Sequence, residues 1–176
     1  LNNYNSNTLA ITLASLGIVL VMATSTFLQL RYWKNTITLF EHALKTTKNN
    51  YVAHNALAYG LHAQGRNEEA MAQDYEALRI RPDYTVSLVN LGNALIRKGQ
   101  FDQAEQHLIH AIGVDPRLAT AYNSLGQLYR QQGKTDLALN NYRKAIEINP
   151  DLAEVHANLG LLSAQQGNID EAVAGY

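Results

Sequence analysis

The three prolines of this chain, Pro82, Pro116 and Pro150, stand 34 residues apart, and other residue types repeat with the same period. The further columns hold leucine, glycine and alanine: Leu57, Leu91, Leu125 and Leu159; Gly65, Gly99, Gly133 and Gly167; Ala70, Ala104, Ala138 and Ala172; Ala77, Ala111 and Ala145. A fixed period of this length predicts a solenoid built from one helix-turn-helix unit. Such arrays present a long curved surface that holds another chain, and they rarely carry out chemistry.

Each repeat unit carries its own helix boundaries. With each proline as the near-last residue, the units are 51–84, 85–118, 119–152 and an incomplete 153–176. The first helix is predicted to end at the glycine column, where glycine adopts a left-handed conformation. An acidic residue three positions later suits the start of the second helix, and these residues are Glu68, Asp102, Asp136 and Asp170. The second helix ends at the proline, which cannot continue it.

This pattern resembles the tetratricopeptide repeat (TPR). Unit two reads TVSLVNLGNALIRKGQFDQAEQHLIHAIGVDPRL, and unit three reads ATAYNSLGQLYRQQGKTDLALNNYRKAIEINPDL. The resemblance covers 51–176 and implies an all-α fold, in which αα-hairpins stack into a TPR superhelix. Asp74 departs from the pattern, because it takes the bulky position that Leu108, Tyr142 and Tyr176 occupy in the other units.

A run without charged residues, TLAITLASLGIVLVMATSTFLQL, occupies residues 8–30. As an α-helix it would span roughly 34 Å at 1.5 Å per residue, enough for a bilayer core of about 30 Å. The aromatic and basic residues that follow, from Arg31 to Lys34, suit the headgroup layer. We therefore expect a transmembrane helix at 8–30 after a flanking loop at 1–7, a membrane location, and the lipid bilayer as a partner. A buried helix of a soluble domain and a cleaved signal peptide are the alternatives.

The side of the membrane that would hold the repeats stays open at this point. The basic residues that follow the apolar run favour the cytoplasm. Small residues on one face of the run, Ala10, Ala14 and Gly17, would allow another membrane helix to approach closely. The net charge of the whole chain is -1, which gives no reason to expect nucleic acid as a partner.

A half-repeat is predicted between the apolar run and the first full unit, at 31–50. Counting back 34 residues from Ala77 places Ala43 in the alanine column, and counting back from Asp74 places Phe40 in the bulky position. The segment KNTITLFEHALKTT therefore resembles a second helix of the repeat.

The junction ATSTFLQLRYWKNTITLFEHALKTTKNNYVAHNAL carries a second resemblance. It is similar to the passage that joins the last membrane helix to the repeats in transmembrane O-mannosyltransferase-like proteins, where the repeats face away from the cytoplasm. This implies an alternative function, the C-terminal part of a polytopic membrane glycosyltransferase of the O-mannosyl- or O-GlcNAc-transferase type, whose repeats position a polypeptide acceptor. The chain starts at Leu1 and stops inside a repeat, which indicates a fragment, so whether the full protein is an enzyme stays open. No catalytic residue is assigned.

In a TPR superhelix the first helices line a concave groove, and here that groove is rich in carboxamides. The resemblance assigns to it Asn55, Tyr59, His62, Asn90, Asn93, Arg97, Asn123, Gln127, Arg130 and Asn158. A carboxamide both donates and accepts hydrogen bonds, so it can hold a peptide backbone of any sequence. Asn90 and Asn158 match the asparagine ladder of the O-linked N-acetylglucosamine transferase repeats, which Ala56 and Ser124 interrupt. We therefore expect a membrane-anchored scaffold that binds a polypeptide in its groove.

Other functions find less support in the sequence. Asn90, Arg97 and Arg130 resemble parts of a basic clamp for a C-terminal carboxylate, but Val89 stands where the clamp needs a lysine. The chain has no cysteine, and His107 and His110 have no third ligand nearby, so no metal site is expected. Neither a glycine-rich phosphate loop nor a hydrolase elbow occurs, and we expect no cofactor. Self-association through the incomplete unit four is a third alternative function.

Overall fold

The computed structural model describes residues 17–22, 24 and 35–167 of the chain. Within these ranges the secondary-structure elements are α-helices, as the sequence predicts. From residue 35 onward they are α2 (Thr36–Thr46), α3 (Tyr51–Ala63), α4 (Asn67–Ile80), α5 (Thr85–Arg97), α6 (Phe101–Val114), α7 (Ala119–Gln131), α8 (Thr135–Ile148) and α9 (Ala153–Gln165).

The chain divides into two compact units, Leu1–Lys48 and Asn49–Tyr176. In the first unit, α2 begins where the Asn35 side chain accepts a hydrogen bond from the backbone N–H of Thr38, at 2.9 Å. This is an ordinary asparagine cap, which satisfies one of the free N–H groups of the first turn. The helix lies within the predicted half-repeat, whose expected partner helix lies largely outside the described residues.

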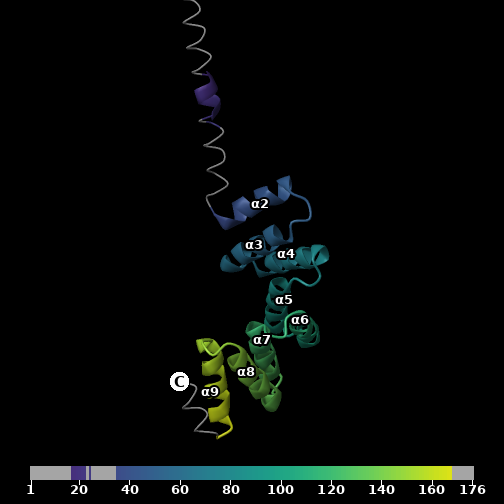
Figure 1. Ribbon diagram of the computed structural model, residues 1–176, viewed down its shortest axis with the longest axis vertical. Coiled ribbons are helices and arrows are strands. Elements are labelled where there is room, and N and C mark those ends of the chain that lie inside the picture. The colour runs from purple at the N-terminus through teal and green to yellow at the C-terminus, as the bar shows by residue number, and fades with distance from the viewer. Residues whose placement is uncertain (1–16, 23, 25–34, 168–176) are drawn as a thin grey trace, which may run out of the picture. The chain divides into compact units, whose positions relative to one another are not determined.

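The second unit is a stack of helical hairpins, visible as successive pairs in Figure 1. Helix α3 packs on α4, α5 packs on α6, and α7 packs on α8. Each hairpin then packs on the following one, through α4 on α5, α6 on α7 and α8 on α9. The all-α hairpin stack predicted from the period is therefore confirmed, whereas the residue boundaries of the repeat units stay a prediction.

The glycine column ends the first helices as predicted. Gly65, Gly99 and Gly133 have φ values of 74°, 72° and 72°, which lie in the left-handed region. After the first of these, the backbone N–H of Arg66 donates to the carbonyl of Leu61 at 3.0 Å. This bond spans the glycine and occupies one of the carbonyls that the helix end leaves free. A residue with a Cβ would strain this turn, which explains why glycine stands at every copy of it.

The ends of the second helices also follow from local chemistry. The acidic residues Glu68, Asp102 and Asp136 lie in the first turns of α4, α6 and α8, whereas Asp170 lies outside the described residues. Helices α4, α6 and α8 stop two residues before each proline, and the residue between is extended. Proline disfavours the helical conformation of the residue before it, so these helices end at a position that the sequence marks.

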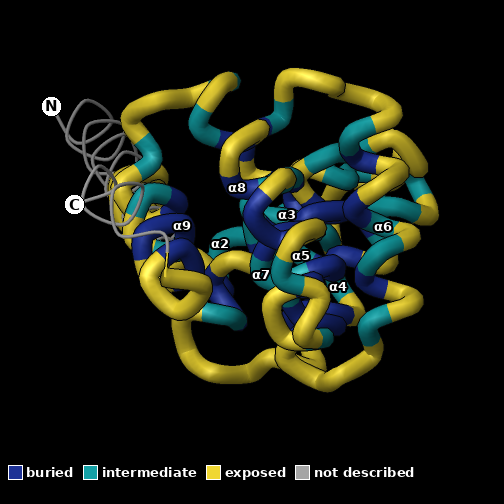
Figure 2. Tube along the Cα trace, turned by 90° about the horizontal axis from the view of Figure 1, so that it is seen from below, coloured by how far each residue is buried: buried dark blue, intermediate teal, exposed yellow. Residues whose placement is uncertain are grey.

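The core of the second unit lies between the helices, where Figure 2 shows the buried segments (dark blue), while the turns are exposed. The alanines of the two alanine columns within α4, α6 and α8 have no exposed surface. Leucines and one tyrosine fill the space beside them, among them Leu91, Leu108, Leu128 and Tyr142, all fully buried. Small side chains allow the helices to approach closely, and the large ones fill the remaining volume.

The predicted membrane location is wrong. Of the predicted transmembrane helix at 8–30, the structure describes only 17–22 and 24, and the other residues of that span lie outside the described part. Among the residues that are described, no helix is both long enough and apolar enough to cross a membrane. The longest bounded helices, such as α4, have 14 residues, which corresponds to about 21 Å against a bilayer core of about 30 Å. The lipid bilayer and other membrane helices therefore gain no support as partners.

Candidate functional site

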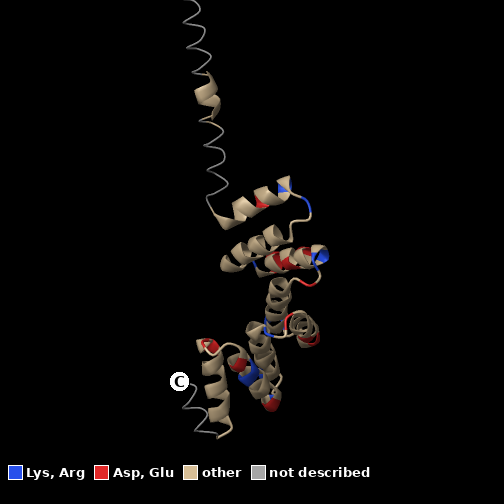
Figure 3. Cartoon of the chain, viewed as in Figure 1, with Lys and Arg blue, Asp and Glu red and all other residues tan. Residues whose placement is uncertain are grey.

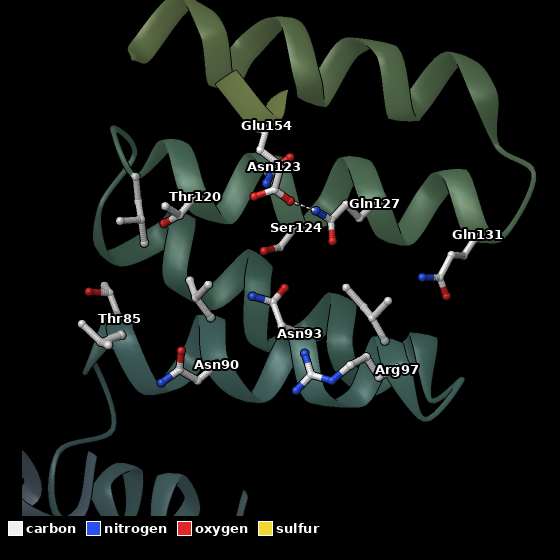
Figure 4. Close-up of a pocket in the computed structure, with 14 residues that line it drawn as sticks. Thr85, Asn90, Asn93, Arg97, Thr120, Asn123, Ser124, Gln127, Gln131 and Glu154 are labelled. Carbon is white, nitrogen blue, oxygen red and sulfur yellow. Dashed lines mark hydrogen bonds between the residues drawn. The ribbon is translucent and has the colours of Figure 1, made fainter. Parts of the chain in front are cut away.

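A cavity of about 610 Å³ lies between α5 and α7 (Figure 4). Its floor is apolar and includes Val89, Ile96 and Leu118. Its walls are polar, with Asn90, Asn93 and Arg97 on α5 and, on α7, Thr120, Asn123, Ser124, Gln127 and Gln131. A second cavity of about 470 Å³ shares Asn90, Asn93 and Arg97 and extends along α3 to His62 and Gly65. Because the two cavities share three residues, we treat them as one amide groove.

The groove repeats with the period of the sequence. Each of these lining residues of α5 has a lining residue of α7 one period of 34 residues later: Val86 and Thr120, Val89 and Asn123, Asn90 and Ser124, Asn93 and Gln127, Arg97 and Gln131. Along each helix these positions are spaced mostly by three or four residues, which places them on one face. The stacking of equivalent hairpins therefore turns one helix face into a continuous wall.

Several amide atoms in the groove lack internal partners. The Oδ1 atoms of Asn93 and Asn123 are buried, and neither accepts a hydrogen bond from another described residue. A buried polar atom without a partner is costly, and native proteins rarely leave one unexplained. Figure 4 shows Asn93 extending from α5 toward α7, and Asn123 on the facing wall. Both atoms therefore offer acceptor capacity between the two helices.

One end of the groove is closed by a hydrogen bond between two helices. The Nε2 of Gln127 donates to Oε1 of Glu154 on α9, with 2.7 Å between the atoms. Glu154 stands one period after Thr120, at the start of the next first helix, so it continues the same wall. Gln127 therefore shares its amide between the groove and this bond.

The structure distributes the ten predicted groove residues unequally. Asn90, Asn93, Arg97, Asn123 and Gln127 line the larger cavity, and His62 lines the smaller one, where its Nδ1 lies 2.9 Å from Oδ1 of Asn67. The remaining four residues, which are Asn55, Tyr59, Arg130 and Asn158, line neither cavity. The predicted set is therefore brought together in its central part.

The four remaining residues have other surroundings. Tyr59 on α3 is 73% exposed. Asn158 on α9 is half-buried, and its Nδ2 has no partner among the described residues. Burial raises the pKa of Tyr142, and the neighbouring Arg130 offsets part of this rise through its hydrogen bond and charge. Arg130 therefore lies beside the core of its own hairpin.

Asn55 belongs to a buried polar cluster around Asp74. Its Nδ2 lies 3.2 Å from Oδ1 of Asp74 and 3.4 Å from Oγ of Ser87. The Ser87 hydroxyl donates to the same Oδ1 at 2.7 Å. Asp74 has no exposed surface, and this burial raises the pKa of its carboxyl, while the hydrogen bonds from Ser87, Asn55 and Asn90 oppose the rise. The cluster lies behind the groove and connects α3, α4 and α5.

Sequence reasoning missed four polar residues of the groove: Thr85, Thr120, Ser124 and Gln131. A signal for three of them was present, because Thr120, Ser124 and Gln131 stand one period after Val86, Asn90 and Arg97. The last two of these were predicted as groove residues, so shifting each predicted position by 34 would have found Ser124 and Gln131. The described residues hold no group of three or more metal-ligating side chains, so the geometry offers binding through amides and hydroxyls.

Comparisons with known proteins place this architecture. A family model described as "TPR repeat" matches 92–133 and 126–167, and one described as "Tetratricopeptide repeat" matches 51–73. Together these matches cover more than half of the chain. A curated relative, "Protein STIP1 homolog" of Dictyostelium discoideum, is 24% identical over 74 residues, which are 42% of this chain and 13% of that protein. The chain thus spans only a small part of that relative.

Solved structures agree with the family models. The chain is similar to TTC0263, a thermophilic TPR protein in Thermus thermophilus, with 28% identity and a TM-score of 0.69 over 88% of this chain and 84% of that one. MamA gives 26% identity and a TM-score of 0.68 over 79% and 81%. YrrB, described as "a TPR protein with an unusual peptide-binding site", gives 22% and 0.65 over 77% and 70%, a likeness that shows the fold alone. On the matches of the family models and these structures, the chain belongs to the tetratricopeptide-repeat family.

Proposed function

We propose that this protein is an interaction scaffold that binds a polypeptide in an extended conformation across α5 and α7, in the amide groove. The observation that carries this proposal is the pair of buried, unpartnered Oδ1 atoms of Asn93 and Asn123. Both atoms can accept hydrogen bonds, and both residues line the cavity. An extended peptide supplies backbone N–H donors along its whole length.

The dimensions of packed helices suit such a ligand. Helices in contact lie about 8–10 Å apart, and an extended chain advances about 3.3 Å per residue. A peptide that crosses the first helices would therefore meet a new helix about every third residue. Because α5 and α7 present equivalent positions to the groove, each step would meet similar side chains, here mostly amides.

The scarcity of charge on the groove helices points in the same direction. Helix α3 has no Lys, Arg, Asp or Glu, α5 has only Arg97, and α7 has only Arg130. By contrast, α4 and α8 carry several charged residues each, which Figure 3 shows in blue and red. A wall of neutral amides can bind the backbone of a peptide without selecting for a strongly charged partner. YrrB, whose description names a peptide-binding site, has the same fold, but the residues of this groove support the proposal by themselves.

The residues that we propose contact the ligand are the predicted set, with Asn90, Asn93, Asn123 and Gln127 at its centre. His62 and Arg97 would extend the contact toward α3. Asn55, Tyr59, Arg130 and Asn158 would contact only a longer ligand that leaves the two cavities.

The test uses the whole chain and a defined probe. A library of random peptides, each about 12 residues long to span several helices, is displayed on phage and selected on the immobilised chain. The enriched peptide is then labelled with fluorescein for anisotropy. We expect the double variant Asn93→Ala, Asn123→Ala to bind this peptide at least about tenfold more weakly, since each lost hydrogen bond is worth about 0.5–1.5 kcal/mol.

The matched control removes two exposed amides from second helices, in the variant Gln106→Ala, Asn140→Ala. We expect it to bind the peptide within about twofold of wild type, because neither side chain reaches the groove and the loss should follow the groove amides alone. Far-ultraviolet circular dichroism confirms that both variants are folded. The proposal is wrong if no peptide is enriched, or if the groove variant binds as tightly as the control.

The glycosyltransferase alternative gains no support from the family models or from the solved structures named above. No observation among the described residues favours that chemistry over the binding of a peptide. The interaction scaffold is therefore the single function that we propose.

A further inference from the structure

Asp74 on α4 is a fully buried carboxyl at a position that is apolar in the other hairpins. Its equivalents one and two periods later are Leu108 and Tyr142, which are also fully buried. Those residues pack against glycines on the facing first helix: a Cβ on Gly92 would lie 2.7 Å from Leu108, and one on Gly126 would clash with the Tyr142 ring. The hairpin can therefore close with an apolar side chain at this position, so its closure does not require a carboxyl.

A buried carboxyl is an unfavourable substitute for leucine. Removing a charge from water costs several kcal/mol unless hydrogen bonds replace the lost hydration. Here Oδ1 receives such bonds from Ser87 on α5 at 2.7 Å and from Asn55 on α3 at 3.2 Å. These two partners come from the helices on either side of α4, so they hold the carboxyl in one orientation.

The second oxygen of Asp74 is in a different situation. Oδ2 is buried and has no hydrogen bond of standard length and angle from another described residue. The amide of Asn90 nevertheless approaches the carboxyl closely enough to lower its pKa by hydrogen bonding. Asn90 lines both cavities of the groove. The carboxyl thus lies directly behind a residue of the proposed binding surface, with one acceptor still available.

We propose that Asp74 is a positioning residue that orients the Asn90 side chain toward a bound peptide. An ionised carboxylate can only accept hydrogen bonds. It therefore selects the amide orientation in which Nδ2 of Asn90 faces Asp74 and Oδ1 faces the groove. In that orientation Asn90 accepts a backbone N–H of the ligand, as Asn93 and Asn123 do farther along. This inference rests on the proposed function, and it specifies how the α3 end of the groove is set.

The test replaces the polar arrangement by the apolar one that the chain already uses. The variant Ala58→Gly, Asp74→Leu reproduces in the first hairpin the pair Gly92 and Leu108 of the second. Asn90 keeps its place but loses the acceptor behind it. With the fluorescein-labelled peptide described above, we expect this variant to bind about fivefold more weakly than wild type, the loss that corresponds to one backbone hydrogen bond. Ala58→Gly alone, which retains the carboxyl, should bind like wild type.

A readout specific to positioning comes from Asn90→Ala. In the wild-type background this substitution should weaken binding about fivefold, whereas in the Ala58→Gly, Asp74→Leu background it should have little further effect, because Asn90 is no longer oriented. A second variant, Asp74→Asn, keeps the shape but places an N–H₂ group where Oδ2 or Oδ1 stood. It should also bind more weakly, and it serves if the leucine variant does not fold.

The outcomes separate the two proposals. If wild type binds no selected peptide, the proposed function fails. If wild type binds and the folded leucine variant binds equally well, or if Asn90→Ala costs the same in both backgrounds, Asp74 is not a positioning residue. When only Asp74→Asn folds, peptide binding equal to wild type overturns the inference in the same way.

Discussion

At the scale of single residues, glycines with the same chemistry have different roles in this chain. Gly65, Gly99 and Gly133 are needed for their positive φ values. Gly126 is helical, and it is needed for space, because a Cβ there would clash with the ring of Tyr142. Gly113 on α6 has neither constraint, since nothing lies within 4 Å of its added Cβ. The effect of adding one methyl group therefore depends on what faces it.

We expect Gly126→Ala to destabilise the protein by about 1–3 kcal/mol, because overpacking a filled core forces the Tyr142 ring to move. This exceeds the gain of up to about 1 kcal/mol that alanine brings to a helix. Gly113→Ala should instead stabilise the protein by about 0.5 kcal/mol. Urea unfolding of both variants measures the difference, and equal effects of the two substitutions would contradict the crowding that we infer.

At the scale of the helices, adjacent hairpins are joined by a bond between α6 and α7. The hydroxyl of Tyr129 donates to Oε1 of Glu105 at 2.6 Å. Burial, together with this hydrogen bond and the charge of Glu105, raises the pKa of Tyr129 to about 12. The Nζ of Lys134 lies 5.7 Å from the centre of the ring. Tyr129 thus keeps its proton well above the pH at which an exposed tyrosine loses it.

The substitution Glu105→Gln should lower the pKa of Tyr129 from about 12 toward the ordinary value of 10. A group whose pKa is higher in the folded state holds its proton longer there, so its contribution to stability falls as pH rises from 10 to 12. The variant should show a smaller loss of stability across this range. NMR of labelled tyrosine rings, assigned with Tyr129→Phe, follows the titration, and an unchanged pKa in the variant would exclude the role of Glu105.

At the scale of the whole molecule, the unit Asn49–Tyr176 is connected mainly through neighbours. Its hairpins contact one another in chain order, through α4 and α5, α6 and α7, and α8 and α9. In such an array the free energy of unfolding is approximately the sum of the unit stabilities and the interfaces between adjacent units. Perturbations at the two ends of the stack should therefore be nearly independent.

We expect Leu61→Ala on α3 and Val155→Ala on α9 to add within about 0.5 kcal/mol in the double variant, because distant sites share no partners. Both side chains are buried, so each substitution alone is destabilising. The matched pair Gly92→Ala and Leu108→Ala lies in direct contact and should be non-additive by about 1–3 kcal/mol, since the smaller side chain makes room for the new methyl group. Urea unfolding of both cycles checks this contrast, and strong coupling between the distant pair would contradict it.

The sequence by itself determined the repeat, the helix ends and the central groove residues. Glycine at positive φ, proline without an N–H and an acidic first turn act through their own backbone or within one helical turn, so they can be read along the chain. The positions of Asn90, Asn93, Asn123 and Gln127 followed from the same periodicity, because equivalent positions of stacked hairpins share one face. An apolar run is weaker evidence, since hydropathy alone does not establish a spanning helix, and the membrane prediction failed.

Only the tertiary structure decided what the side chains do between helices. Asn55 was predicted as a groove residue, but it bonds to Asp74, and Arg130 lies beside Tyr142. Gln127 bonds to Glu154 across α7 and α9. Each of these pairings joins residues of different helices, and it depends on distances of a few tenths of an ångström that no spacing along the chain specifies. A hydrogen bond forms between the atoms that packing brings within about 3 Å, so the partners of a polar side chain become known only when the helices are in place.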